Sequence, residues 1–213
     1  MKIRKERKSF SLASEYQLGI LFGCGSIVTE KGDEVLVIRH KDKYFLEQVQ
    51  NLFIGNKIGY RKHNNKEYYI LKSKAFDYES LFKIGYKARN DSQRYLPILD
   101  KYNDFLRAYI ELHGYWDYCT THKRNKEKYY RLRLRIYGNY FLINEINRIL
   151  SKEVGVKLKS VQMVKSNNTT SYIAYTSLEE ICAIRKYLDN TPCNKSYWND
   201  VDIKIKNPRI DSI

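Results

Sequence analysis

The chain is poor in the residues that crosslink small secreted proteins or hold structural zinc. Its 213 residues include four cysteines, Cys24, Cys119, Cys182 and Cys193. No two of them form a Cys-x-x-Cys pair, and their spacings match no zinc ribbon or finger. A disulfide framework is not expected in a chain long enough to bury a core of its own. We therefore expect reduced, separate thiols.

Long apolar runs are also missing. No stretch of about 18 apolar residues occurs, which argues against a helix that spans a membrane. A basic arm at residues 1–13 is not followed by an apolar signal core, because the run at 18–22 is short and broken by a glycine. We expect an intracellular protein.

Acidic residues are too few to balance the basic ones. The chain has 39 Lys and Arg against 24 Asp and Glu, a formal net charge of +15. Such a charge attracts polyanions, and nucleic acid is favoured because each neutralised phosphate releases a counterion. A membrane-surface protein would concentrate its charge on one amphipathic helix. Here the cations are spread along the whole chain, so no membrane partner is expected.

The periodicity of the apolar residues predicts the same seven elements twice. The first copy is expected as a helix at 14–23, strands at 26–29 and 34–40, a helix at 42–54, strands at 57–62 and 67–72, and a helix at 77–87. The second is expected as a helix at 99–113, strands at 115–121 and 129–137, a helix at 139–152, strands at 157–165 and 170–176, and a helix capped by a Ser177–Glu180 capping box. This order predicts an α+β fold of two pseudo-symmetric αββαββα repeats. The expected segments are an arm at 1–13, repeats at 14–90 and 99–190, a linker at 91–98, and an irregular tail at 191–213.

The helices that open the two repeats carry a common signature. Residues 17–25 read QLGILFGCG and residues 106–114 read LRAYIELHG. Both resemble the nine-residue motif of the LAGLIDADG homing endonucleases, and 86–97, YKARNDSQRYLP, resembles the loop before that family's second motif. The resemblance covers about residues 14–190. It implies that the motif helices pack together at a pseudo-two-fold axis, through the small residues Gly19, Gly23 and Ala108.

The same resemblance implies a saddle of two four-stranded antiparallel sheets that lies along the major groove of duplex DNA. In active members the eighth motif residue is Asp or Glu, and the two carboxylates hold divalent metal over the scissile phosphates. Here these positions are Cys24 and His113. A thiol is a soft ligand and neutral imidazole carries no charge, so both changes disfavour Mg²⁺. We expect that cleavage is lost and that no cofactor is needed, with Mg²⁺ bound only if nuclease activity survives.

Other metal ligands near Cys24 and His113 stay possible. Glu111 is expected to point away from the site, because it precedes His113 by two helical residues. Glu30 and Asp117 lie on nearby strands and are possible substitute ligands. Zinc held by Cys24, His113 and Cys119 is the less favoured alternative.

The sharpest local pattern is the run Arg131-Leu132-Arg133-Leu134-Arg135-Ile136. Period two places Arg131, Arg133 and Arg135 on one face of a strand, where three like charges repel one another and favour an anionic partner. Further candidates for DNA contact are Ser26, Val28, Val37, Arg39, Arg61, His63, Tyr115, Asp117, Lys157, Lys159, Lys165 and Tyr172. The basic turns at 123–126 and 62–66 are additional candidates for contact with phosphates.

These observations favour a monomeric, sequence-specific, double-stranded DNA-binding protein that does not cleave, such as a transcriptional regulator. One alternative is an active homing endonuclease with non-standard metal ligands. Others are a maturase-like protein that binds intron RNA, RNA being the less favoured partner, and a protein-interaction module.

Overall fold

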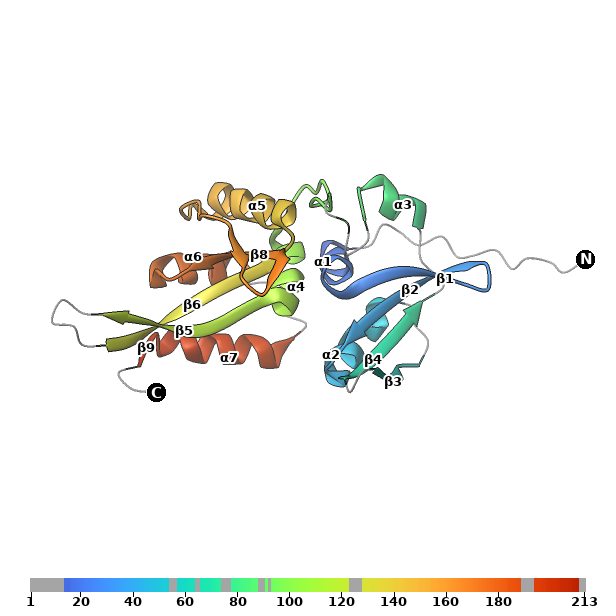
Figure 1. Ribbon diagram of the computed structural model, residues 1–213, viewed down its shortest axis with the longest axis horizontal. Coiled ribbons are helices and arrows are strands. Elements are labelled where there is room, and N and C mark those ends of the chain that lie inside the picture. The colour runs from blue at the N-terminus through green and yellow to red at the C-terminus, as the bar shows by residue number, and fades with distance from the viewer. Residues whose placement is uncertain are drawn as a thin grey trace, which may run out of the picture.

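Two similar halves flank a central pair of helices, α1 (Glu15–Cys24) and α4 (Asn103–His113) (Figure 1). The computed structural model describes residues 14–53, 57–63, 66–73, 78–87, 91, 93–122, 128–188 and 194–210. The predicted basic arm at 1–13 and the basic turn at 123–126 lie outside the described residues, as does part of the turn at 62–66.

The first half contains one four-stranded sheet. After α1 come β1 (Gly25–Glu30), β2 (Asp33–His40), α2 (Lys43–Val49), the 3-10 turn η1 (Gln50–Leu52), β3 (Gly59–His63), β4 (Lys66–Ser73) and α3 (Tyr78–Lys83). The strands are antiparallel in the order β1-β2-β4-β3. The β1–β2 hairpin turns at Lys31 and Gly32, both with positive φ. This is what a two-residue type I′ turn requires, and it lies where the sequence predicts a turn.

The second half repeats this order. After α4 come β5 (Gly114–His122), β6 (Lys128–Gly138), α5 (Tyr140–Ile149), the π turn η2 (Leu150–Val154), β7 (Gln162–Val164), β8 (Asn167–Tyr175) and α6 (Leu178–Tyr187). Its sheet has the order β5-β6-β8-β7, the same arrangement as in the first half. The predicted α+β fold of two αββαββα repeats is confirmed.

One part of the second repeat differs from the prediction. The strand expected to begin at Lys157 is reduced to β7, so Lys157 and Lys159 lie in the irregular segment that precedes it. Their backbone N–H groups donate to the side chains of Glu180 (3.1 Å) and Asn147 (3.0 Å) and not to a neighbouring strand. Because Glu180 is engaged there, the capping box predicted with Ser177 does not form.

The two central helices approach each other closely. A Cβ on Gly19 would lie 2.4 Å from the carbonyl oxygen of Phe105 and 2.7 Å from the Cβ of Ala108. A Cβ on Gly23 would lie 2.4 Å from Cδ1 of Leu112. At Gly19 only glycine fits, because the atoms that a Cβ would meet are a backbone oxygen and the Cβ of Ala108, which cannot turn aside. At Gly23 a larger residue would require the Leu112 side chain to move.

One hydrophobic core runs through both halves. It contains Phe22 from α1 and Phe105 from α4, whose rings meet edge to face with centroids 5.4 Å apart. Helix α1 is buried on nearly all sides, as its apolar sequence predicts, and its N-terminus is closed by a capping box between Ser14 and Gln17. Within the described parts of the chain, no helix has the length and apolar character to cross a bilayer.

Residues 194–210 form regular structure, where the sequence analysis expected an irregular tail. It forms α7 (Lys195–Lys206) and the short strand β9 (Arg209–Ile210), which pairs with β6. The side chain of Asn194 caps α7 by accepting from the N–H of Tyr197. Trp198 and Val201 are buried in the core. The expectation of an irregular tail is therefore wrong for these residues: α7 is a helix whose Trp198 packs against Trp116 of β5.

Candidate nucleic-acid interface

Each sheet turns one face to the core and leaves the other face open. In the first sheet Leu36, Ile38 and Leu71 point into the core. The residues of opposite parity therefore share the other face, because side chains alternate along a strand. This set includes the predicted contacts Ser26, Val28, Arg39 and Arg61. His63 has the same parity, but its side chain lies outside the described residues.

Val37 was grouped with these candidates, and the structure corrects that expectation. Its side chain is only 2% exposed and packs with Val35 and Ile70 in a small second apolar cluster. Val28 and Tyr68 pack against the same cluster. Val37 is therefore buried in the apolar cluster of the open face of the first sheet and offers almost no surface to a ligand.

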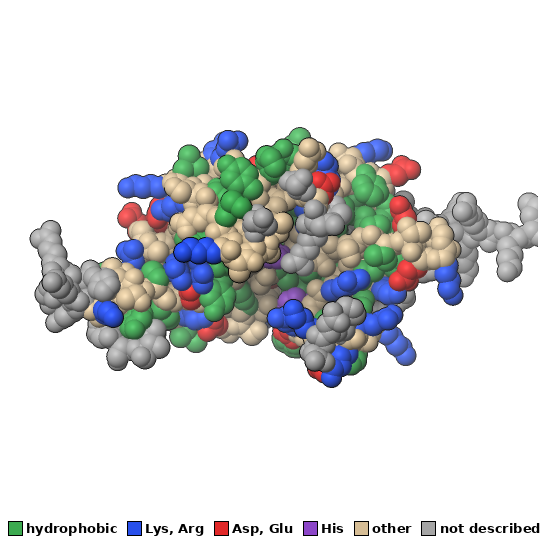
Figure 2. All heavy atoms as spheres, in the orientation of Figure 1, with side chains coloured by type: hydrophobic (Ala, Val, Ile, Leu, Met, Phe, Trp, Pro, Cys, Tyr) green, Lys and Arg blue, Asp and Glu red, His purple; other side chains and the backbone are tan. Residues whose placement is uncertain are grey.

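The open face of the second sheet carries six of the predicted candidates: Tyr115, Asp117, Arg131, Arg133, Arg135 and Tyr172. Leu132, Leu134 and Ile136 of β6 are buried, so the arginines that alternate with them lie on the opposite side. The strand register places Tyr115, Asp117 and Cys119 of β5 across from Arg135, Arg133 and Arg131. One broad face of the molecule shows Lys and Arg side chains on both halves (Figure 2).

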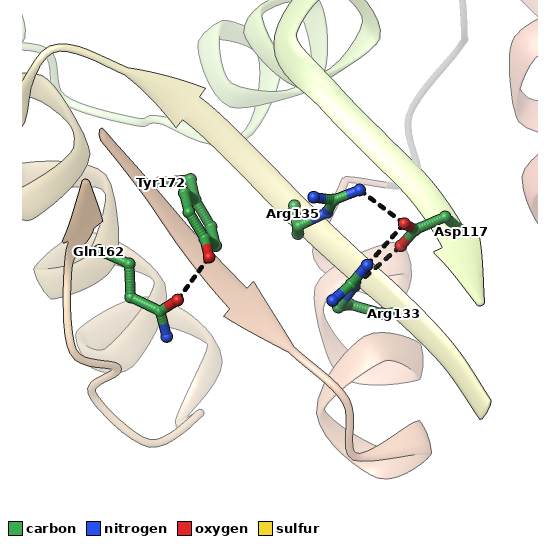
Figure 3. Close-up of polar contacts among 5 residues, drawn as sticks. All are labelled: Asp117, Arg133, Arg135, Gln162 and Tyr172. Atoms are coloured by element: carbon green, nitrogen blue, oxygen red, sulfur yellow. Dashed lines mark hydrogen bonds and ion pairs between the residues drawn. The ribbon is translucent and has the colours of Figure 1, made fainter. Parts of the chain in front are cut away.

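A carboxylate from the neighbouring strand sits between two of the arginines. Asp117 accepts two hydrogen bonds from Arg133, from Nε to Oδ1 (2.9 Å) and from Nη2 to Oδ2 (2.7 Å) (Figure 3). Its Oδ2 also accepts from Nη2 of Arg135 at 2.6 Å. The hydrogen bonds that Arg133 donates to Asp117 raise the pKa of Arg133. Asp117 therefore relieves part of the repulsion among the arginines. The sequence analysis expected three charges without such a partner.

Aromatic rings extend this face beyond the ion pairs. The Arg135 guanidinium lies over the rings of Tyr115 (5.1 Å) and Tyr137 (5.5 Å). Tyr137 contacts Tyr172 (5.3 Å between centroids), and the Tyr172 hydroxyl donates to Oε1 of Gln162 at 2.5 Å (Figure 3). Tyr137 and Gln162 were not among the predicted residues, although the period-two pattern of β6 that selected the arginines also selects Tyr137.

The three lysines predicted on the fourth strand of this sheet lie elsewhere. Lys159 forms an ion pair with Glu180 of α6 (2.7 Å) and lies 5.2 Å from the centre of the Tyr175 ring. Lys157 is exposed in the irregular segment before β7, and Lys165 is exposed in the turn between β7 and β8. Neither Lys157 nor Lys159 is on a strand, because the backbone there bonds to side chains of α5 and α6.

Cys24 and His113 end the two central helices, as the motif positions predict. The His113 ring lies across the helix pair, with Nε2 2.9 Å from the carbonyl oxygen of Gly23. Since a carbonyl only accepts, Nε2 carries the proton and donates. The imidazole therefore binds the backbone of α1 through this nitrogen. It is also in contact with the Tyr109 ring, 4.8 Å away.

This donor set does not fit Mg²⁺. Magnesium needs hard oxygen ligands, whereas the helix ends supply a thiol and an imidazole whose Nε2 is engaged. The two carboxylates considered as substitutes have partners elsewhere: Glu30 pairs with Lys72 at 2.5 Å, and Asp117 holds the arginines. Within the part of the chain that the structure describes, no three His, Cys, Asp or Glu side chains are placed to hold a metal ion.

A cavity of about 690 Å³ lies beside His113. It is bounded by the ends of the central helices, the linker, the β6–α5 junction and the start of β8, and Asp91 is the one acidic side chain among its described lining residues. The linker residue Arg94 also lines it, is 3% exposed, donates to the carbonyl of Leu21 (3.3 Å) and lies over the Phe22 ring. No pattern in the polar linker predicts that Arg94 is buried.

Glu111 is directed away from His113, as helical geometry predicts. Its carboxylate accepts from the Tyr16 hydroxyl and from Nε1 of Trp198, both at 2.5 Å, and the residue as a whole is 9% exposed. Burial raises the pKa of this carboxyl, although both hydrogen bonds act to lower it. Glu111 therefore links α1, α4 and α7 as a structural residue.

Glu111→Gln is expected to change how stability depends on pH. The pKa of Glu111 is higher in the folded state than in the unfolded state, where it is about 4.3. Protonation of Glu111 therefore stabilises the fold fully below about pH 4.3, and this stabilisation is lost as pH rises through the folded-state pKa. Glutamine cannot titrate. The free energy of unfolding of the wild type should therefore fall relative to that of the variant as pH is raised from about 4 to 8. Urea unfolding of both proteins across this range tests it, and parallel curves would contradict it.

No protein-family model matches the chain, and no curated protein matches its sequence. Solved structures, in contrast, do match the fold of the chain. I-SmaMI bound to an uncleaved DNA target in the presence of calcium ions aligns with 92% of this chain and 92% of that chain, at a TM-score of 0.56 and 10% identity. The LAGLIDADG homing endonuclease I-GzeII in complex with its DNA target aligns with 92% of each chain, at a TM-score of 0.53 and 11% identity.

The LAGLIDADG homing endonuclease I-LtrWI bound to target DNA gives a TM-score of 0.56 at 14% identity, over 90% of this chain and 88% of that chain. Such low identities establish the fold alone. The two αββαββα halves and the central helix pair thus agree with what the two sequence motifs imply: the chain has the fold of the LAGLIDADG homing endonucleases.

Proposed function

We propose that the chain binds double-stranded DNA in a sequence-specific manner, through the open faces of its two sheets, and does not cut it. The observation that supports this proposal most strongly is the composition of the open face of the second sheet. There Arg131, Arg133 and Arg135 project from one strand beside exposed and half-buried tyrosines. Arginine forks match phosphate oxygens and base edges, and a two-stranded β-ribbon fits the major groove.

The fold supports the same proposal. The solved structures of I-SmaMI, I-GzeII and I-LtrWI were determined with DNA targets bound, and their architecture is that of this chain. The net charge of +15 supplies the long-range attraction that such binding requires. On this basis Ser26, Val28, Arg39 and Arg61 are proposed contacts on the first sheet, and Tyr115, Arg131 and Tyr172 on the second.

The loss of cleavage follows from the helix ends. Phosphodiester hydrolysis in a two-metal site needs carboxylates to hold the ions and neutralise their charge. Cys24 and His113 supply neither carboxylate, and the neighbouring cavity adds only Asp91 among its described residues. Retained affinity without cleavage suits a regulator or a protein that occludes its target site.

The proposal is tested by selecting bound sequences from random duplexes and then measuring affinity against salt. We expect a dissociation constant of about 10⁻⁸ M or lower for the selected site. The logarithm of the affinity should fall linearly with the logarithm of the salt concentration, with a slope that reports roughly 6–10 phosphate contacts. A supercoiled plasmid that carries the site should stay uncut in Mg²⁺ and in Mn²⁺.

Other outcomes identify the alternatives. Nicking that Asp91→Asn abolishes would mean an active nuclease with unusual ligands. Tighter binding to structured RNA than to duplex DNA at equal salt would favour a maturase-like role. No binding to either nucleic acid at moderate salt would favour a protein-interaction module and reject the proposal.

A further inference from the structure

We propose that Arg133 and Asp117 together read one G·C base pair, with Asp117 as the specificity-determining residue. This inference rests on the proposed function and names the base that this part of the surface selects. It starts from the ion pair in Figure 3, which lies on the open face of the second sheet and is neither buried nor fully exposed.

The geometry of Arg133 leaves a second recognition edge. Its Nε and Nη2 atoms are both engaged by Asp117, at 2.9 and 2.7 Å, along one side of the guanidinium. A guanidinium has five N–H donors, so the Nη1–Nη2 edge still presents two parallel donors. Two parallel donors match the O6 and N7 acceptors of guanine, which is the commonest specific contact to that base.

Fixing the side chain is what makes this edge selective. A free arginine is flexible and binds any phosphate, whereas one that is held by a bidentate carboxylate is already oriented, so less entropy is lost on binding. The side chain of Arg133 is 26% exposed and that of Asp117 is 21% exposed, so both reach the surface without being freely solvated.

Asp117 also acts on the other base of the pair. Its Oδ1 accepts one hydrogen bond and its Oδ2 accepts two. A carboxylate has about four acceptor positions, so Oδ1 retains one. The N4 amino group of cytosine donates in the major groove, whereas O4 of thymine accepts and would oppose the carboxylate. The pair therefore favours guanine beside Arg133 with cytosine beside Asp117, and it disfavours thymine at the position beside Asp117.

Arg135 is a positioning residue in this arrangement. It donates to Oδ2 of Asp117 at 2.6 Å, and its guanidinium is held over the rings of Tyr115 and Tyr137. It thereby gives Oδ2, the oxygen that Arg133 also binds, a second cationic partner and offsets part of the charge of the carboxylate. Without this second cation the carboxylate would repel the DNA backbone more strongly.

The test compares selected sequences for the wild type, Asp117→Asn and Arg133→Lys. A control variant, Asp200→Asn, removes a carboxylate of the same kind that pairs with Lys204 (2.7 Å) within α7 and whose side chain is 62% exposed. We expect the wild type and the control to discriminate G·C from A·T at one position by about 10- to 100-fold. Both interface variants should reduce that ratio to about threefold or less, while Asp117→Asn binds random duplex more tightly because an anion is removed.

The possible failures are distinguishable. If both interface variants keep the base preferences of the wild type and still bind DNA, Arg133 and Asp117 do not read a base pair. The proposed function would then still stand. A wild type that binds no duplex would overturn both. If Asp117→Asn unfolds, Arg133→Lys decides the outcome, because it keeps the charge and loses only the paired edges.

Discussion

Replacing Gly19 with alanine is expected to lower the free energy of unfolding by about 3 kcal/mol, the upper part of the range for overpacked cores. The added Cβ would lie 2.4 Å from the carbonyl oxygen of Phe105 and 2.7 Å from the Cβ of Ala108. Neither atom belongs to a flexible side chain, so the clash can be relieved only by moving α1 away from α4. Because this contact joins the two halves, the whole core must adjust.

Urea unfolding followed by circular dichroism measures the effect. Gly59→Ala is the matched control, since a Cβ at Gly59 has only the carbonyl oxygen of Ile70 nearby, at 3.9 Å. That variant should differ from the wild type by less than about 0.5 kcal/mol. Equal stability of Gly19→Ala and wild type would mean that the two motif helices do not touch as described.

The fold was predictable because its signals are local and occur twice. Period-two and helical spacings identify the elements without knowledge of their neighbours, and the motif stretches at 17–25 and 106–114 mark equivalent helices. Glycines four residues apart on one helix indicated where another backbone could approach, and Gly19 and Gly23 do face α4. Period two also assigned Arg131, Arg133 and Arg135 to the face opposite the core.

The partners on that face were not predictable, because they depend on register between strands. Arg133 faces Asp117 only because the β5–β6 pairing places these two residues opposite each other. A shift of one residue would place Trp116 opposite Arg133 and turn Asp117 to the other side. The sequence shows the charges on each strand but does not give this pairing.

Tertiary contacts also decided the segments that lack periodicity. The linker is fastened by residues far along the chain: Asn139 donates to the carbonyls of Asp91 and Arg94, and Glu145 accepts from the N–H of Leu96. These contacts place Arg94 in the core between the halves. Likewise Lys157 and Lys159 appear strand-like in sequence, but side chains of α5 and α6 satisfy their backbone N–H groups.

Replacing Trp198 with alanine is expected to cost about 4 kcal/mol, as for other buried tryptophans. Trp198 is 2% exposed, meets Trp116 of β5 edge to face at 6.5 Å, and has the Arg185 guanidinium over its ring at 4.8 Å. It also donates to Glu111 at 2.5 Å. Truncation would therefore leave a large cavity and remove a hydrogen bond from a buried carboxylate, which adds to the penalty.

Thermal unfolding should show a drop in Tm of roughly 10 °C for a chain of this size. Ile203→Ala is the control on the same helix: its side chain is 60% exposed, so little change is expected. Equal stability of the two variants would mean that α7 is not docked. Because Trp116 rests on Trp198 and the next residue is Asp117, loosening α7 should also loosen the strand that positions Arg133. Trp198→Ala should then weaken discrimination of the G·C pair more than it weakens binding to random duplex.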